Sequence, residues 1–237
     1  MATTNITAAT APSTTVLRRD GRPFALRPGF AAGGVVLLVT AIVLHIWVVQ
    51  PHARGAGRAV SLAVILLIAA ALHRLTGSGR RDVGLRLDTL APAARLVIPP
   101  TLLAGAALIL FGAALGTLRF PPNVLAGFAL YPIWGLVQQY ALQGLVLLGL
   151  EAAGAGSRAP VLAAGLFALV HLPNPLLTAV TFLAGWAWCE AFRRRPNLLV
   201  LALSHGWLAV TLFASLPLPL TGQLRIGPDY LRVMGLL

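Results

Sequence analysis

A few polar side chains lie deep inside otherwise apolar stretches of this sequence, and they are the residues best suited to chemistry. A glutamine amide can orient a water molecule or a carbonyl group, but it has no proton-accepting state near neutral pH. An imidazole has a pKa of about 6.5 and can act as a base or an acid there. We therefore predict one buried polar site, formed by Gln138, Gln139, Gln143, His171 and His205.

The spacing of these residues supports a shared site. Gln139 and Gln143 are four residues apart and share one helix face, whereas Gln138 points about 100° away from Gln139. At about 1.5 Å per residue, Gln139, His171 and His205 lie roughly 17, 20 and 14 Å from the inner ends of their segments. Three helices would thus bring polar groups to a similar level. The alternative is that these groups only hydrogen-bond across helices and hold them together.

Long apolar segments must position these residues. Hydrophobic residues make up 58% of the 237-residue chain and charged residues only 10%, too few to coat a soluble domain. Spans of about 20 apolar residues cross a bilayer as helices, which satisfy their own backbone hydrogen bonds. We predict an all-α, multi-pass transmembrane bundle with about seven spans. They lie near residues 29–49, 59–75, 96–117, 124–150, 158–176, 177–192 and 196–216.

The basic residues set the expected orientation. The net charge is +12 and all 18 basic residues are arginines, which lie between the apolar segments. This pattern fits the positive-inside rule and not the basic stripe of a nucleic-acid-binding module. With a cytoplasmic N-terminus, 13 arginines fall inside and 5 outside. We expect an integral protein of the bacterial plasma (inner) membrane, with a disordered cytoplasmic tail at 1–28, a transmembrane domain at 29–216 and a C-terminal tail at 217–237.

The order of the polar motifs resembles that of the CPBP or Abi family, the CAAX-protease and bacteriocin-processing intramembrane proteins. That family has Glu-Glu-x-x-x-Arg, then Phe-x-x-x-His, then His-x-x-x-Asn on successive membrane helices. Here the first motif reads Gln138-Gln139-x-x-x-Gln143, the second is intact at 167–171, and the third has Ala209 after His205. The resemblance covers about residues 80–215 and includes Gly84-Leu85. A membrane-surface helix at 81–95 is a further expectation.

The resemblance implies an intramembrane endopeptidase in which a glutamate activates water and the histidines assist. Glutamine cannot serve as that base, and loss of a general base costs about 10²–10⁴ in rate. Three glutamines replace two acids and one base together, so no buried charge is left unpaired. We expect a degenerate site that binds a hydrophobic peptide or a prenyl-like substrate, with weak or no peptidase activity.

Two other functions stay open at this stage. One is an active endopeptidase or other hydrolase that uses a histidine base; the other is a transporter or a non-enzymatic membrane partner. We expect no cofactor, and we expect no metal, since a catalytic zinc takes about three protein ligands and the sequence offers two deep histidines. The partners we expect are the lipid bilayer and a hydrophobic or prenylated substrate, and not nucleic acid.

Overall fold

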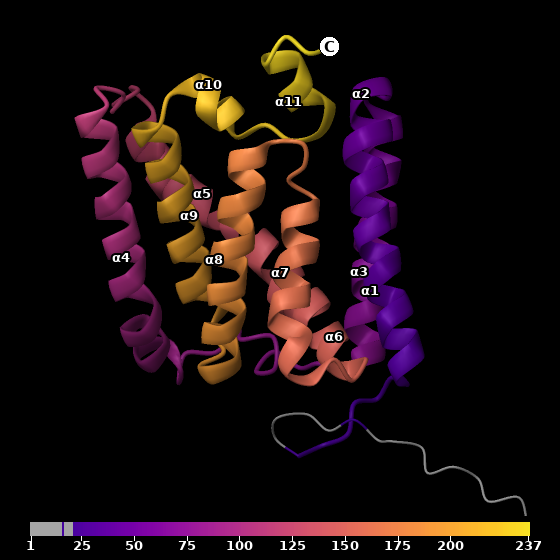
Figure 1. The fold of residues 1–237 in the computed structure, drawn as a ribbon. Helices are drawn as coiled ribbons and strands as arrows, with labels where there is room; N and C mark the ends of the chain where they lie inside the picture. The colour runs from indigo at the N-terminus through magenta and orange to yellow at the C-terminus, as the bar shows by residue number, and fades with distance from the viewer. Residues whose placement is uncertain (1–15, 17–20) are drawn as a thin grey trace, which may run out of the picture.

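The computed structural model describes residue 16 and residues 21–237, and this part of the chain forms a bundle of helices (Figure 1). Six helical segments are long and apolar enough to cross a membrane. The prediction of a multi-pass helical bundle is therefore confirmed. The six are Pro28–His52 (α1, a π-helical turn and α2), Ala56–Thr76 (α3), Leu90–Ala114 (α4), Val124–Ala152 (α5, a π-helical segment and α6), Pro175–Arg194 (α8) and Leu198–Ser215 (α9).

The fifth predicted segment is shorter than expected. Helix α7 covers only Ala159–Leu169, after a 3₁₀ turn at Gly156–Arg158, whereas the apolar run suggested a helix to residue 176. Pro173 and Pro175 explain the early end, because a proline lacks the N–H that an interior helical position needs. Asn174 then begins α8: its side chain accepts a hydrogen bond from the Leu177 N–H at 3.0 Å. His171 consequently lies in the turn after α7 and not inside a helix.

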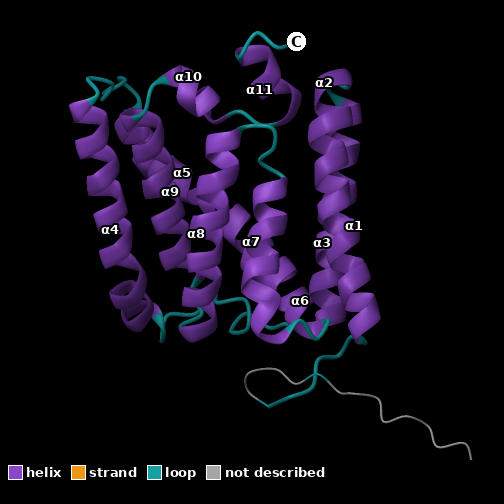
Figure 2. Cartoon of the chain, viewed as in Figure 1, coloured by secondary structure: helices purple, strands orange, loops and turns teal. Residues whose placement is uncertain are grey.

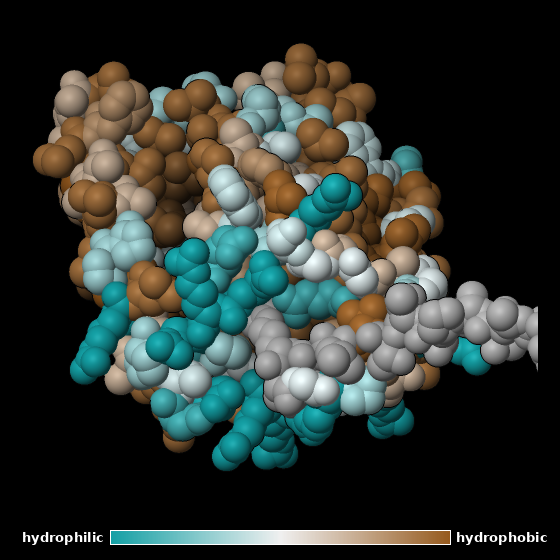
Figure 3. All heavy atoms as spheres, turned by 60° about the horizontal axis from the view of Figure 1, so that its bottom comes forward, coloured by the Kyte–Doolittle hydropathy of each residue, from teal (hydrophilic) through white to brown (hydrophobic). Residues whose placement is uncertain are grey.

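The two ends of the bundle differ in charge. The chain enters α1 at one end and finishes at the other (Figure 1). Hydrophilic atoms gather over the end where α1 begins, while brown apolar atoms cover the sides (Figure 3). We call this the basic end, because the helix ends and loops there carry Arg74, Arg80, Arg81, Arg86, Arg95, Arg158, Arg193, Arg194 and Arg195. The predicted tail at 1–28 falls mainly on residues outside the described part of the chain.

Small residues let α9 pack closely between α4 and α5. A Cβ atom on Gly206 would lie 2.7 Å from the Pro132 nitrogen, and one on Gly135 would lie 2.9 Å from the Ala202 oxygen. Close backbone approach through small residues is the usual way that membrane helices gain packing energy without a hydrophobic driving force. The α5–α9 contact brings residue 205 next to residue 139.

The expectation of a surface helix at 81–95 is wrong. Residues 90–95 belong to α4, and residues 77–89 form a loop that lies against the start of α9. Gly84 has φ +80° and accepts a hydrogen bond from the Leu198 N–H at 2.9 Å. A Cβ on Gly84 would lie 2.8 Å from the Phe192 ring, so a continuous helix with a larger residue would not fit.

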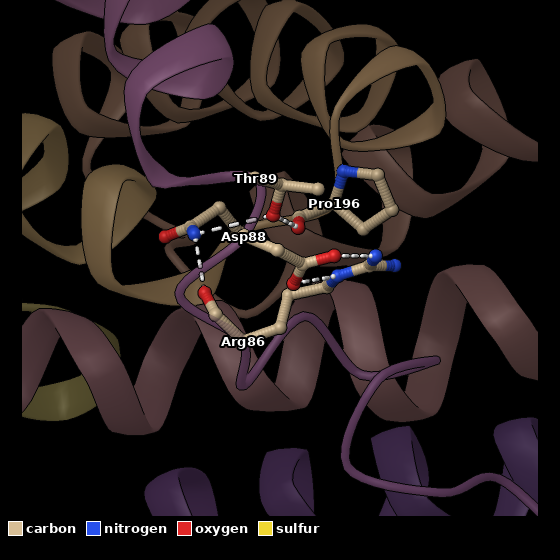
Figure 4. A network of polar contacts seen from close by, with 5 residues as sticks. Arg86, Asp88, Thr89 and Pro196 are labelled. Atoms are coloured by element: carbon tan, nitrogen blue, oxygen red, sulfur yellow. Dashed lines mark hydrogen bonds and ion pairs between the residues drawn. The ribbon is translucent and has the colours of Figure 1, made fainter.

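A polar network fastens this loop to α9 (Figure 4). Asn197 caps α9 by accepting from the Val200 N–H at 3.1 Å, and it donates to the Arg86 carbonyl at 2.8 Å. Thr89 donates to the Pro196 carbonyl at 2.6 Å. The Arg86 guanidinium, hydrogen-bonded to Asp88, lowers the pKa of that exposed carboxyl to about 2. The loop is therefore tied to the start of α9 by the donors of Asn197 and Thr89, while the exposed Arg86–Asp88 ion pair lies within the loop.

The C-terminal segment 217–237 is folded onto the opposite end of the bundle. It contains the short helices α10 (Leu218–Thr221) and α11 (Gly227–Val233), which lie among the loops at that end (Figure 2). Asn174 donates to the Thr221 carbonyl at 2.8 Å and to the Arg225 carbonyl at 3.1 Å. The Gly227 N–H donates to the Leu172 carbonyl at 2.8 Å. One side chain thus fixes both the start of α8 and the C-terminal segment.

Candidate functional site

Two buried glutamines and one histidine form a hydrogen-bonded chain between α5 and α9. Gln143 Nε2 donates to Gln139 Oε1 at 3.0 Å, so Gln139 presents its own Nε2 to His205 Nδ1 at 3.4 Å. An amide nitrogen can only donate, so Nδ1 accepts and the imidazole proton lies on Nε2. Both glutamine side chains are fully buried. The result is a neutral network in the middle of the bundle.

A widened helix carries the second glutamine. Residues Tyr140–Leu147 are π-helical, directly after the α-helical turn that holds Gln139. π-Helical insertions occur often at functional sites, because they change the direction of side chains within a continuous helix. The Oε1 atom of Gln143 is buried and accepts no hydrogen bond from the described residues. This amide therefore has hydrogen-bonding capacity that the fold does not use.

His171 reaches the same region through Phe167. The Phe167 ring lies edge-on to both imidazoles, with centroids 4.8 Å from His171 and 6.1 Å from His205. His171 Nδ1 donates to the Phe167 carbonyl at 2.7 Å, which leaves the lone pair on its Nε2. The two histidines thus hold opposite tautomers: Nε2 can accept a proton in His171 and can donate one in His205. Such a pair has the elements of acid–base chemistry.

A second polar chain positions His205 from the other side. The Trp188 ring stacks on His205, with centroids 4.8 Å apart and an interplanar angle of 17°. Trp188 Nε1 donates to Ser204 Oγ at 3.0 Å, and Ser204 Oγ lies 2.7 Å from Thr101 Oγ1. Helices α4, α8 and α9 therefore all fix the orientation of this imidazole.

Gln138 does not join the network. It is half-buried, and no described residue forms a hydrogen bond with its side chain. The 100° offset from Gln139 explains this, since the helix face that bears Gln139 is the one packed against α9. The structure thus brings together Gln139, Gln143 and His205, places His171 one aromatic ring away and leaves Gln138 outside.

A groove opens beside His205. It has a volume of about 1000 Å³, with α4 and α8 as its walls and α9 as its floor. Apolar side chains dominate the lining, and His205, Ser204 and Thr181 are among the polar exceptions. Ala209, at the position where the family pattern has asparagine, also lines the groove one turn after His205. A membrane-soluble molecule could therefore approach the imidazole from the side of the bundle.

The carboxylates lie away from the glutamine network. Glu151 pairs with Arg193 at 3.2 Å at the basic end. Glu190 lines the groove near that end. Within the described part of the chain, no three His, Cys, Asp or Glu side chains come together as metal ligands would. The groups beside the imidazoles are amides, hydroxyls and aromatic rings.

Comparison with known proteins identifies the region that holds these groups. Residues 120–211 match the family model described as type II CAAX prenyl endopeptidase Rce1-like. The resemblance to the CPBP family is confirmed. The matched stretch is less than half of the chain, and it contains all five predicted site residues. No curated protein and no solved structure matches the chain. Over this stretch the chain is similar to CAAX-protease-type membrane proteins.

The sequence prediction missed the groove and the groups that support His205. Trp188 and Thr101 come from segments that look like ordinary apolar spans. Their roles depend on which helices become neighbours, and the hydropathy of one segment does not reveal this. A threonine or a serine inside a membrane helix is weak evidence alone, because it often bonds its own backbone, as Thr101 also does with the Val97 carbonyl at 2.8 Å.

Proposed function

We propose that this protein binds a hydrophobic peptide or a prenyl-like substrate in the groove beside His205, with weak or no peptidase activity. The observation that carries the proposal is the neutral amide chain from Gln143 through Gln139 to His205. In this chain Gln139 and Gln143 stand where the CPBP pattern has the second acid of its pair and its arginine. Within the described residues no carboxylate is hydrogen-bonded to either imidazole, so the family's glutamate base has no counterpart in this network.

The groove supplies the binding half of the proposal. Its lining is mostly apolar, and it lies between helices that cross the membrane. Moving an apolar chain from the lipid into this groove would change its free energy little, because both surroundings are apolar. Selectivity must therefore come from the few polar groups that converge on the groove. His205, whose Nε2–H can donate, lines the groove and is placed to contact a carbonyl group of such a substrate.

The test combines binding and cleavage in one reconstituted system. Wild-type protein in vesicles is given a fluorescent prenylated peptide, and both retention and cleavage are measured. We expect retention that falls with Ala209→Leu, which narrows the groove, and cleavage no faster than with His205→Ala. Cleavage by the wild type that His171→Ala abolishes would contradict the proposal.

A second candidate function is hydrolysis with a histidine base. The opposite tautomers of His171 and His205 favour it, because one Nε2 can accept a proton while the other donates one. This candidate predicts turnover that falls on acidification, because the imidazole that accepts the proton must be neutral. Turnover that stays level between pH 5 and pH 8 would count against it.

We also propose that the basic end faces the cytoplasm. Arginine-rich loops are retained on that side of bacterial membranes. Cys189 is the only cysteine in the sequence and is buried, so single cysteines introduced into the loops can be labelled selectively. A membrane-impermeant thiol reagent applied to intact cells should label a cysteine in the loop at 120–123 and not one at 77–81; the reverse pattern would overturn the orientation.

A further inference from the structure

The groove between α4 and α8 carries two charged residues at the basic end. Glu190 and Arg194 both line it, and they are four residues apart on α8. Within the described part of the chain, neither side chain forms an ion pair or a hydrogen bond with another residue. Arg194 is exposed and Glu190 is half-buried. The adjacent Arg193, by contrast, forms an ion pair with Glu151. The groove therefore has an acid and a base at its mouth that the fold leaves available.

The position of these charges suits a lipid headgroup. Arg194 is the last residue of α8, so it lies where a membrane-spanning helix meets the headgroup layer. From Arg194 to Leu176 the groove follows α8 for 18 residues, or about 27 Å, which is nearly the thickness of a hydrocarbon core. A molecule that fits this shape has a charged end at Arg194 and an apolar chain that runs toward Trp188 and beyond.

The two opposite charges restrict the headgroup further. Arginine binds phosphate with strong, charge-assisted hydrogen bonds. A glutamate close to that phosphate repels a purely anionic headgroup, but it stabilises an ammonium group beside the phosphate. Side chains at positions i and i+4 of a helix have Cβ atoms about 6 Å apart, a separation that a phosphate and a primary ammonium joined by a two-carbon linker can match.

We propose that an aminophospholipid of the phosphatidylethanolamine type occupies this groove. Its phosphate binds Arg194, its ammonium group donates to Glu190, and one acyl chain lies between α4 and α8 against Trp188. The inference rests on the lining and the charges of the groove and does not depend on the proposed function. Lipid in the groove would lie in the path of any peptide that approaches His205 from the membrane.

Brominated acyl chains test the occupant directly, because bromine quenches tryptophan fluorescence on contact. The full-length protein is reconstituted in phosphatidylcholine vesicles that contain an equal fraction of brominated phosphatidylethanolamine or brominated phosphatidylglycerol. Each measurement is repeated with Trp188→Phe, so that the difference isolates quenching of Trp188. Arg195→Gln is the matched control for Arg194→Gln, since it removes the same charge one residue away and does not line the groove.

We expect brominated phosphatidylethanolamine to quench Trp188 at lower lipid fractions than brominated phosphatidylglycerol. Arg194→Gln should weaken this association about tenfold, the size of one lost charge-assisted hydrogen bond, and Arg195→Gln should leave it unchanged. Glu190→Gln should remove the preference for the amine-bearing lipid.

Three results would overturn the proposal: equal quenching by the two lipids, stronger quenching by phosphatidylglycerol, or equal effects of Arg194→Gln and Arg195→Gln. Quenching of Trp188 by a brominated hydrophobic peptide and by neither lipid would make the groove a peptide site only. The proposed function would then stand while this inference fails. Peptide cleavage by the wild type would contradict the proposed function. It would not change the lipid measurement, so the lipid inference would stand.

Discussion

Two pairs of buried amides in this protein use the same functional group in different ways. Asn174 and Asn197 lie at opposite ends of the bundle, and each caps a helix through its oxygen. Each also donates twice to a neighbouring segment: Asn174 to the carbonyls of residues 221 and 225, and Asn197 to the Arg86 carbonyl and the Thr89 hydroxyl. Every hydrogen-bonding group that these two side chains present is used to hold the fold.

The glutamine pair in the middle of the bundle is less completely bonded. Gln143 Oε1 has no partner among the described residues, and the Gln139–His205 contact is long at 3.4 Å. A buried polar group without a partner costs about 1–3 kcal/mol, so the fold alone gives no reason to keep one there. The contrast separates amides that stabilise the structure from amides that remain available to a ligand.

The largest expected effect is the loss of a helix-end asparagine. Asn174→Ala removes a cap and leaves two carbonyls of the C-terminal segment without their donor, so we expect unfolding to become easier by about 3–5 kcal/mol. Asn197→Ala should have a similar effect at the basic end. Cys189 is buried, and a fluorogenic thiol reagent can therefore follow its exposure during thermal unfolding.

Asn123→Ala is the matched control for these variants. Asn123 precedes α5, but its side chain makes no capping hydrogen bond and it is exposed. Its replacement should change stability by no more than about 0.5 kcal/mol. If Asn174→Ala were as mild as Asn123→Ala, the helix-end amides would not be the structural ones, and the comparison would fail.

The next effect should come from a charge in the middle of the bundle. Gln139→Glu places a carboxylate at a fully buried position with no arginine at residue 143, and we expect a loss of about 2–4 kcal/mol. Adding Gln143→Arg should restore at least half of the lost stability, because the two charges then pair. Gln138→Glu, at a half-buried position outside the network, should cost much less. Thermal unfolding of the wild type and these three variants gives the comparison, and equal losses of stability at 138 and 139 would contradict it.

A smaller effect is expected from the contact that brings α5 and α9 together. Gly206→Ala forces a methyl group against the Pro132 backbone and ring. Overpacking of this kind lowers the free energy of unfolding by about 1–3 kcal/mol. Gly165→Ala in α7 meets no atom within 4 Å and should be neutral or slightly stabilising. The fluorescence of Trp188, which stacks on His205, should change in the first variant only. Unchanged fluorescence in Gly206→Ala would show that this contact does not position the imidazole.

The smallest effect concerns the exposed ion pair at the basic end. The pKa of Asp88 is lowered to about 2 by the hydrogen bond from Arg86. A lowered carboxyl pKa stabilises the fold above the unfolded-state value and loses this contribution as pH falls through about 2. The thermal midpoints of wild type and Asp88→Asn should therefore differ slightly at pH 5–8 and converge in strong acid. A difference that persists at the acid limit would rule out the ion pair as its cause.

Hydropathy, motif order and helical depth were sufficient to predict the bundle and the meeting of Gln139 with His205. A span must be helical and the rise of a helix is fixed, so counting residues places side chains at a level in the membrane. Gln138, which we predicted to share the site, lies outside it, because helical periodicity turns it about 100° away from Gln139. These predictions rest on local geometry, which the sequence determines directly.

Other features depend on contacts between distant segments, and they were missed or wrong. The 81–95 segment looked amphipathic, yet Gly84 packs against Phe192 and turns the chain away from a helix. Asn197 directly precedes an apolar run, a recognised helix-start signal, but its bonds to residues 86 and 89 could not be inferred from it. The folded C-terminal segment likewise depends on Asn174, and nothing in residues 217–237 alone indicates it.

The most direct test of a disabled protease site is to rebuild the family pattern on this scaffold. A variant with Gln138→Glu, Gln139→Glu, Gln143→Arg and Ala209→Asn is compared with wild type for cleavage of a prenylated peptide in vesicles, and each is paired with His205→Ala. We predict that the wild type cleaves no faster than its His205→Ala partner, while the rebuilt chain gains cleavage that His205→Ala removes. Cleavage by the wild type that matches the rebuilt chain and requires His205 would contradict this account.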